Sequence, residues 1–168
     1  MSSYEVRAIR FIHQIFPYFK DCKCCEDYQW AVMKFNRDCS RSVKFDHGQT
    51  RVAFMTSDYV VKLDYNPIGV QRWGGCEEEH KFYEYAFREG YAYLFAKIKP
   101  YYYRGIVFYI MPRVKGIGKY LYDADEYMAD HEVSWCWNSG LRDLHNFNYG
   151  WKNGNIIIID YGANQYRK

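Results

Sequence analysis

The stretch GLRDLHNFNYGWKNGNIIIIDYG, residues 140–162, decides how this chain is interpreted. It places Asp143 and Asn148 five residues apart, and Asp160 directly follows a run of four isoleucines. The Asn-Gly dipeptide in its middle is a strong signal for a two-residue turn between antiparallel strands. The stretch therefore predicts a small hairpin flanked by two carboxylates and one carboxamide.

Carboxylate and carboxamide side chains in this arrangement suit phosphoryl transfer. That reaction needs a metal ion held against the phosphates of a nucleotide, a cation on those phosphates, and an acceptor aligned with them. Magnesium prefers carboxylate and carbonyl oxygens. An Asp and an Asn that converge on the metal, with a second Asp near the acceptor, meet this need.

Upstream of this stretch, apolar residues alternate with polar ones at a period of two, which is typical of β-strands. The alternation begins at residue 43 and is interrupted by turn residues such as Ser57-Asp58. A second strand pair is expected to join near Tyr103-Arg104-Gly105. The predicted strands occupy 43–48, 50–57, 58–66 and the two halves of 94–114.

Helical periodicity appears in four other segments, 4–20, 26–36, 76–88 and 119–139. Pro17 is expected to bend or end the first helix, because proline cannot donate a helical hydrogen bond. Cys136 is expected in the core. In the last helix, the residues expected to face inward are Leu121, Tyr122, Met128, Val133 and Trp137.

Composition excludes several classes of protein. The 168 residues are 49% apolar, which is enough for one domain with a sizeable core. A net charge of +3, with acids and bases interspersed, argues against a nucleic-acid-binding protein. There is no run of about 18 apolar residues and no signal-peptide pattern. We therefore expect a cytoplasmic protein that contacts neither nucleic acid nor membrane.

Six cysteines are present, four of them between residues 22 and 39. Their spacing does not match the paired C-x2-C pattern of common zinc sites, and His47 has no near partner. Cysteines of a cytosolic chain are normally reduced. We expect free thiols, with a zinc site as the less favoured alternative.

Two motifs carry a resemblance to a known family. The segment RDLHNFN resembles the protein-kinase catalytic loop H-R-D-L-x-x-x-N, with Asp143 and Asn148 in register. DYG at 160–162 resembles the DFG motif, with Tyr161 in place of Phe. The chain looks like a compact kinase-like protein of the type that bacteriophages encode. By this resemblance, Asp143 orients or deprotonates the acceptor hydroxyl, and Asn148 and Asp160 hold Mg²⁺.

The resemblance extends to the lysine strand of kinases. YVVKLD resembles V-A-I-K, which implies that Lys62 contacts the α- and β-phosphates of ATP. The helix that follows should supply a Glu to pair with Lys62, and Glu77, Glu78 and Glu79 compete for this role. We favour Glu79, because it lies four residues before Tyr83 on the inward face.

Two further nucleotide contacts are implied by position in the kinase order. The segment 45–54 occupies the place of the glycine-rich loop, with Gly48 as its one glycine. YIMPRV occupies the hinge, where backbone groups around Met111 and Arg113 would meet adenine.

The implied fold is a truncated, two-lobed, protein-kinase-like α+β domain. Residues 1–42 form an N-terminal helical extension, and 43–111 form an N-lobe with a five-stranded sheet. Residues 112–168 form a minimal helical C-lobe that carries the catalytic loop and DYG. The implied cofactors are ATP and Mg²⁺.

The implied function is an ATP- and Mg²⁺-dependent phosphotransferase, acting on Ser or Thr of a protein. If the chain is phage-encoded, its place is the host cytoplasm. The sequence departs from a standard protein kinase in several places, among them Leu141, which replaces the catalytic-loop His. Two departures favour an alternative, a pseudokinase binding module that works by contact with a protein partner. The phosphate loop has one glycine, and only six residues follow Gly162, so no activation segment is expected. A third option is a kinase fold that acts on a small molecule or transfers AMP.

Overall fold

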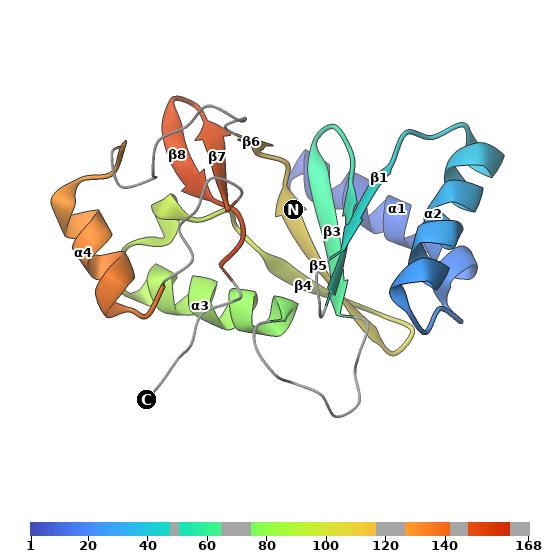
Figure 1. The fold of residues 1–168 in the computed structure, drawn as a ribbon, viewed down its shortest axis with the longest axis horizontal. Coiled ribbons are helices and arrows are strands. Elements are labelled where there is room, and N and C mark those ends of the chain that lie inside the picture. The colour runs from blue at the N-terminus through green and yellow to red at the C-terminus, as the bar shows by residue number, and fades with distance from the viewer. Residues whose placement is uncertain (48–50, 65–74, 117–126, 142–147, 162–168) are drawn as a thin grey trace. The chain divides into compact units, whose positions relative to one another are not determined.

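The computed structural model describes residues 1–47, 51–64, 75–116, 127–141 and 148–161. The chain divides into two compact units, each described below by itself. The first unit comprises residues 1–71 and 99–113, and the second comprises residues 72–98 and 114–168. The architecture is mixed α+β, with four α-helices among the described residues (Figure 1).

A five-stranded antiparallel sheet forms the centre of the first unit, as the sequence predicts. Its order is β1-β2-β3-β5-β4, so β3 is the middle strand and β1 and β4 are the edges. Each predicted strand is present, with bounds shorter than the alternating pattern. The strands are β1 (Lys44–His47), β2 (Arg51–Met55), β3 (Tyr59–Asp64), β4 (Lys99–Tyr103) and β5 (Ile106–Pro112).

Two helices, α1 (Ser3–Phe19) and α2 (Cys25–Cys39), pack against this sheet and each other (Figure 1). Every second residue of β3, namely Tyr59, Val61 and Leu63, joins their core. The helices contribute ten of the eighteen buried residues of that core. The ten are Ala8, Phe11, Ile12, Ile15, Phe16, Phe19, Tyr28, Ala31, Val32 and Phe35.

The first helix passes through Pro17, a residue expected to bend or end it. Proline has no N–H to donate. The helix nevertheless continues to Phe19, and its last turn closes when the Lys20 N–H donates to the Phe16 carbonyl at 3.0 Å. A proline near a helix end removes one bond only, so the turn survives.

The second unit contains helices α3 (Cys76–Arg88) and α4 (Asp130–Asn138) and a short 3₁₀ helix, η1 (Ala92–Leu94). The bounds of α3 agree with the predicted 76–88. Strands β6 (Lys115–Gly116), β7 (Tyr149–Lys152) and β8 (Asn155–Ile158) form an antiparallel sheet in that order.

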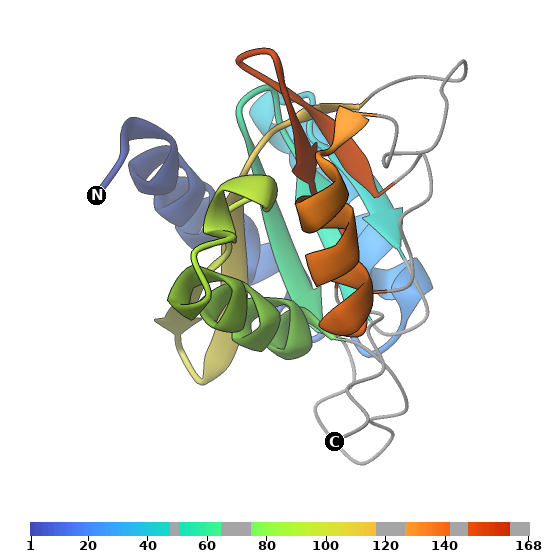
Figure 2. The ribbon, with the colours of Figure 1, turned by 90° about the vertical axis from the view of Figure 1, so that its left-hand side faces the viewer.

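Aromatic rings hold α3 and α4 together, and the two helices lie beside each other in Figure 2. The Trp135 ring of α4 stacks on Tyr85 of α3, with centroids 5.8 Å apart, and on Tyr91 at 4.4 Å. Phe82 of α3 meets Phe95 edge-on at 5.3 Å. Such pairs add a modest energy beyond the area that they bury.

The helix predicted at 119–139 is shorter in the described residues. It begins at Asp130 and has nine residues, and residues 117–126 lie outside the described ranges. The inward placement of Trp137 was wrong, because its side chain is 45% exposed. Cys136, one position earlier and so about 100° around the helix, is fully buried as predicted.

Two further observations concern the described ranges. The cysteines are free thiols, and no cluster of three metal-binding His, Cys, Asp or Glu side chains occurs there. Within the same ranges, no helix combines the length and apolarity that crossing a membrane requires. The predicted boundaries at residues 42 and 111 remain predictions.

Candidate functional site

The β7–β8 hairpin brings two predicted metal ligands next to each other. The register pairs Tyr149 with Ile158, so the residues just outside this pair meet at the open end of the hairpin. The Asn148 carbonyl accepts the Ile159 N–H at 2.6 Å and the Asp160 N–H at 3.3 Å. Asn148 and Asp160, which are twelve positions apart in the sequence, are therefore neighbours through the backbone.

The Asn-Gly turn of this hairpin sets that register. Asn153 and Gly154 have φ angles of 55° and 83°, so both adopt the left-handed conformation of a type I′ turn. Asn and Gly tolerate this region better than other residues do. The sequence predicted both the turn and the hairpin, and both are confirmed.

The residue after Asp160 is fixed by two hydrogen bonds. The Tyr161 N–H donates to the Glu79 carboxylate at 3.2 Å, and the Tyr161 hydroxyl donates to the Ala96 carbonyl at 2.6 Å. The tyrosine is 1% exposed, and its ring lies 5.9 Å from Phe82 and 5.0 Å from Phe95 between centroids. Asp160 thus precedes a firmly anchored side chain.

Residues 95 and 96 also support the outgoing strand of the hairpin. Phe95 forms a parallel bridge with Ile158, and the Ala96 N–H donates to the Ile158 carbonyl at 2.8 Å. Ala96 therefore binds the segment twice, through its N–H to Ile158 and through its carbonyl to Tyr161. These bonds fix the backbone on either side of Asp160.

Burial distinguishes the three candidate glutamates at the start of α3. Glu77 and Glu78 are exposed or half-exposed and contact the Lys81 ammonium at 2.9 and 3.2 Å. Glu79 is fully buried and binds the backbone of Tyr161. Its predicted pairing with Lys62 remains a prediction, because the two residues belong to different units.

Among the residues that the structure describes, Lys62 is one of the few buried charged ones. It lies in the middle strand β3, where it pairs with Ala53 of β2 and Tyr109 of β5, and it is 7% exposed. Its neighbours Val61 and Leu63 belong to the core beneath the helices. Because side chains alternate along a strand, Lys62 lies on the sheet face opposite α1 and α2.

The predicted hinge residues lie at the end of β5. Met111 pairs with Val60 of β3 and is 2% exposed. The Arg113 N–H donates to the Asp58 carbonyl at 2.9 Å. Because the Arg113 N–H already binds Asp58 within the first unit, a ligand at this position would have to contact a carbonyl or a neighbouring N–H.

Two predicted residues, Gly48 and Asp143, lie outside the described residues, so the structure places neither. Sequence reasoning missed the bond from the Tyr161 hydroxyl to Ala96. The sequence shows that Tyr161 replaces the Phe of the DFG motif. It does not show the acceptor of the Tyr161 hydroxyl, because that acceptor is a backbone carbonyl and side-chain patterns carry no information about it. The hydrogen bond from the Arg113 N–H to the Asp58 carbonyl was not predicted for the same reason.

No protein-family model matches the chain, and no curated protein matches it. Among solved structures, a similarity is found to the bifunctional kinase-methyltransferase WbdD, with 17% sequence identity and a TM-score of 0.35. The match covers 68% of this chain and 30% of that protein, so the chain spans less than a third of its neighbour.

Proposed function

We propose that this chain is a phosphotransferase that depends on ATP and Mg²⁺ and adopts a truncated, two-lobed, protein-kinase-like fold. The observation that carries the proposal is the open end of the β7–β8 hairpin. There the Asn148 carbonyl binds the backbone of Asp160, so a carboxamide and a carboxylate that the motifs assign to a metal lie on neighbouring backbone.

The donor set at this end of the hairpin fits magnesium. Asn148 and Asp160 both offer oxygen, which a hard cation prefers to nitrogen or sulfur. A bound Mg²⁺ would neutralise charge on the transferred phosphate. The protein contributes rigidity, since the backbone around Asp160 is tied to Asn148 on one side and to Glu79 through Tyr161 on the other.

The remaining roles follow the motif order. Lys62 supplies the cation for the α- and β-phosphates, and its burial in a middle strand supports a fixed position for that charge. Asp143 orients or deprotonates the acceptor hydroxyl, which we assign to Ser or Thr of a protein substrate. Adenine would meet backbone groups near Met111 and Arg113, apart from the Arg113 N–H that Asp58 engages.

Titration calorimetry with ATP, with and without Mg²⁺, tests this proposal when combined with labelled phosphate transfer. We expect Asp160→Asn to lose the Mg²⁺-dependent part of ATP affinity and to unfold at an unchanged temperature. Asp143→Ala should keep that affinity and lose transfer. Asp21→Asn serves as the control, because this carboxylate has an 88% exposed side chain and lies outside the motifs.

Unchanged Mg²⁺-dependent turnover in Asp160→Asn would contradict the metal assignment. A wild-type protein that binds no nucleotide would favour the second candidate, a pseudokinase module that acts by contact with a protein partner. The feature that favours this candidate is the segment 45–54, which has one glycine where a phosphate-binding loop normally uses several.

A further inference from the structure

The outward face of α2 has a composition that the proposed function does not use. One side of this helix, formed by Tyr28, Ala31, Val32 and Phe35, is buried in the core. The opposite side carries Glu26, Trp30, Met33 and Arg37, all of them exposed. Their spacing of four, three and four residues places them along one seam, as in the heptads of a coiled coil.

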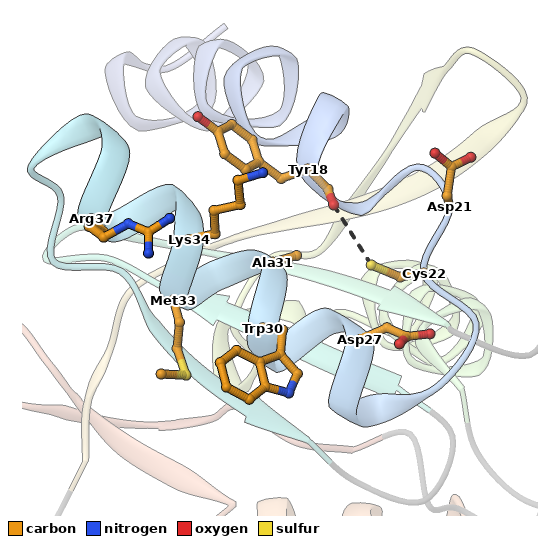
Figure 3. A pocket seen from close by; sticks show the side chains of 9 residues that line it. All are labelled: Tyr18, Asp21, Cys22, Asp27, Trp30, Ala31, Met33, Lys34 and Arg37. Carbon is orange, nitrogen blue, oxygen red and sulfur yellow. Dashed lines mark hydrogen bonds between the residues drawn. The ribbon is translucent and has the colours of Figure 1, made fainter.

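The centre of this seam is apolar. Trp30 is 68% exposed and Met33 is 54% exposed, and residues three apart on a helix are surface neighbours. Figure 3 shows both side chains projecting from the same side of α2. Trp and Met are enriched in protein interfaces, whereas a solvated helix face usually carries neither.

A shallow depression of about 650 Å³ adjoins the seam (Figure 3). It runs between the end of α1 and α2 and is large enough to receive a bulky side chain. Its lining residues are Tyr18, Asp21, Cys22, Asp27, Trp30, Ala31, Met33, Lys34 and Arg37.

The charges on this face are arranged by sign along the helix. Glu26 and Asp27 lie in its first turn, and Lys34 and Arg37 lie towards its end. The helix dipole favours this distribution in any single helix. The dipole does not, however, explain a Trp and a Met between the two charged ends.

An antiparallel copy of the same helix complements this face at every seam position. Positions 26 and 37 are equally distant from the midpoint of the seam, as are positions 30 and 33. A two-fold axis at that midpoint would therefore place Glu26 opposite Arg37 of the second copy. It would place Trp30 opposite the second copy's Met33, and the charged pairs would repeat at both ends.

We propose that α2 is a self-association surface, on which α2 of a second copy of this chain docks antiparallel. The occupant is a second copy because one helix face supplies both halves of each complementary pair. The existing surface pair of Arg37 with Asp38, at 3.2 Å, is solvent-exposed and costs little to rearrange. The face of α2 is only about 22 Å long, so we expect a weak dimer, with a dissociation constant on the order of 10–100 μM.

Charge swaps test the pairing directly, with sedimentation velocity over a concentration series. Glu26→Arg places like charges at both ends of the dimer, and so does Arg37→Glu. We expect each variant alone to raise the dissociation constant at least about tenfold. An equimolar mixture of the two should associate to within about threefold of wild type, because each Arg then faces a Glu.

The mixture separates pairing from effects on a single helix. Both substitutions oppose the helix dipole and lower stability, but an unfavourable dipole cannot restore association on mixing. Trp30→Ala should also raise the dissociation constant at least about tenfold. The control Tyr102→Ala removes an aromatic ring that is 75% exposed on β4 and should leave association unchanged.

Three results would overturn the proposal. The first is a wild-type protein that stays monomeric up to millimolar concentration, which would leave this face to a different partner. The second is wild-type-like self-association of either charge variant alone. The third is a mixture that associates no better than its components.

Discussion

At the scale of single residues, the Tyr161 hydroxyl is a polar group in apolar surroundings. Tyr161 is buried with its ring near Phe82 and Phe95, and its hydroxyl donates to the Ala96 backbone carbonyl. A phenylalanine would fill the same space but would leave the Ala96 carbonyl without this donor. A buried polar group that loses its partner costs more than the bond itself contributes.

We therefore predict that Tyr161→Phe destabilises the protein by about 1–2 kcal/mol in chemical unfolding. Amide hydrogen exchange should also become faster at Ile159 and Tyr161, whose N–H groups bind Asn148 and Glu79. Under the proposed function, Mg²⁺-dependent ATP affinity would fall as well. Tyr102→Phe is the matched control, since that residue is 75% exposed and should not change any of these values.

Glu5 is a second residue with a definite electrostatic role. It is 5% exposed, it forms an ion pair with the Lys99 ammonium, and it accepts the Ser2 N–H at 2.6 Å. Burial alone would raise the pKa of this carboxyl. The bonds from Lys99 and Ser2 outweigh burial, so the pKa of Glu5 is lowered from its usual value of 4.5.

A lowered carboxyl pKa stabilises the fold above the unfolded pKa, and this stabilisation disappears as pH falls through the folded value. We predict that Glu5→Gln lowers the free energy of unfolding by about 1 kcal/mol at neutral pH, since Lys99 is partly solvated. The difference from wild type should shrink as pH falls below 4.5 and vanish once Glu5 is fully protonated in the folded protein, as measured by urea unfolding across acidic pH. A difference that persists there would mean that Glu5 acts through packing instead of charge.

At the scale of elements, the β7–β8 hairpin depends on its turn. Gly154 has a φ of 83° and no atom within 4 Å of the place that a Cβ would take, so a side chain would meet strain in the backbone alone. Gly105, in the β4–β5 turn of the other unit, has a φ of 81° and equally open surroundings. The two glycines form a matched pair in different hairpins.

We predict that Gly154→Ala and Gly105→Ala each destabilise their unit by about 1 kcal/mol, because alanine at positive φ is strained. If the metal ligands lie at the open end of β7–β8, only Gly154→Ala should weaken Mg²⁺-dependent ATP binding in calorimetry. Equal weakening by both variants would mean that binding follows overall stability and not the register of this hairpin.

The elements that sequence predicts well share strong local signals. Residues 76–88 combine helical spacing with three acids in the first turn, and α3 has those bounds. The Asn-Gly turn similarly marked β7 and β8. The start of α4 was harder to predict, because a cap sets it and apolar spacing does not. The Ala129 N–H donates to the Glu132 carboxylate at 2.8 Å, and the helix begins at the next residue.

The candidate site was predictable only in part, for a physical reason. Side-chain types at motif spacing predict Asn148, Asp160 and Glu79 as candidate site residues. The hydrogen bonds that hold the segment around Asp160 in place are made by backbone groups of Asn148 and Ala96. Sequence patterns do not reveal such backbone contacts. Long-range backbone pairing depends on the whole fold, and residue types constrain it weakly.

At the scale of the whole molecule, α1 and α2 belong to the same compact unit as the five-stranded sheet. They supply more than half of the buried residues beneath the sheet. Phe19 illustrates this, since it is 1% exposed and its ring centroid lies 5.6 Å from those of both Phe54 and Phe108.

We predict that Phe19→Ala destabilises the first unit by about 3–5 kcal/mol, through lost burial and the cavity that remains. Phe87→Ala is the matched control, because that ring is 65% exposed and its removal should change stability by less than about 0.5 kcal/mol. Removing residues 1–42 should then prevent the sheet from folding, as measured by the loss of cooperative thermal unfolding. A truncated chain that unfolds cooperatively would show that the sheet is stable without these helices. Residues 1–42 would then be a separable extension.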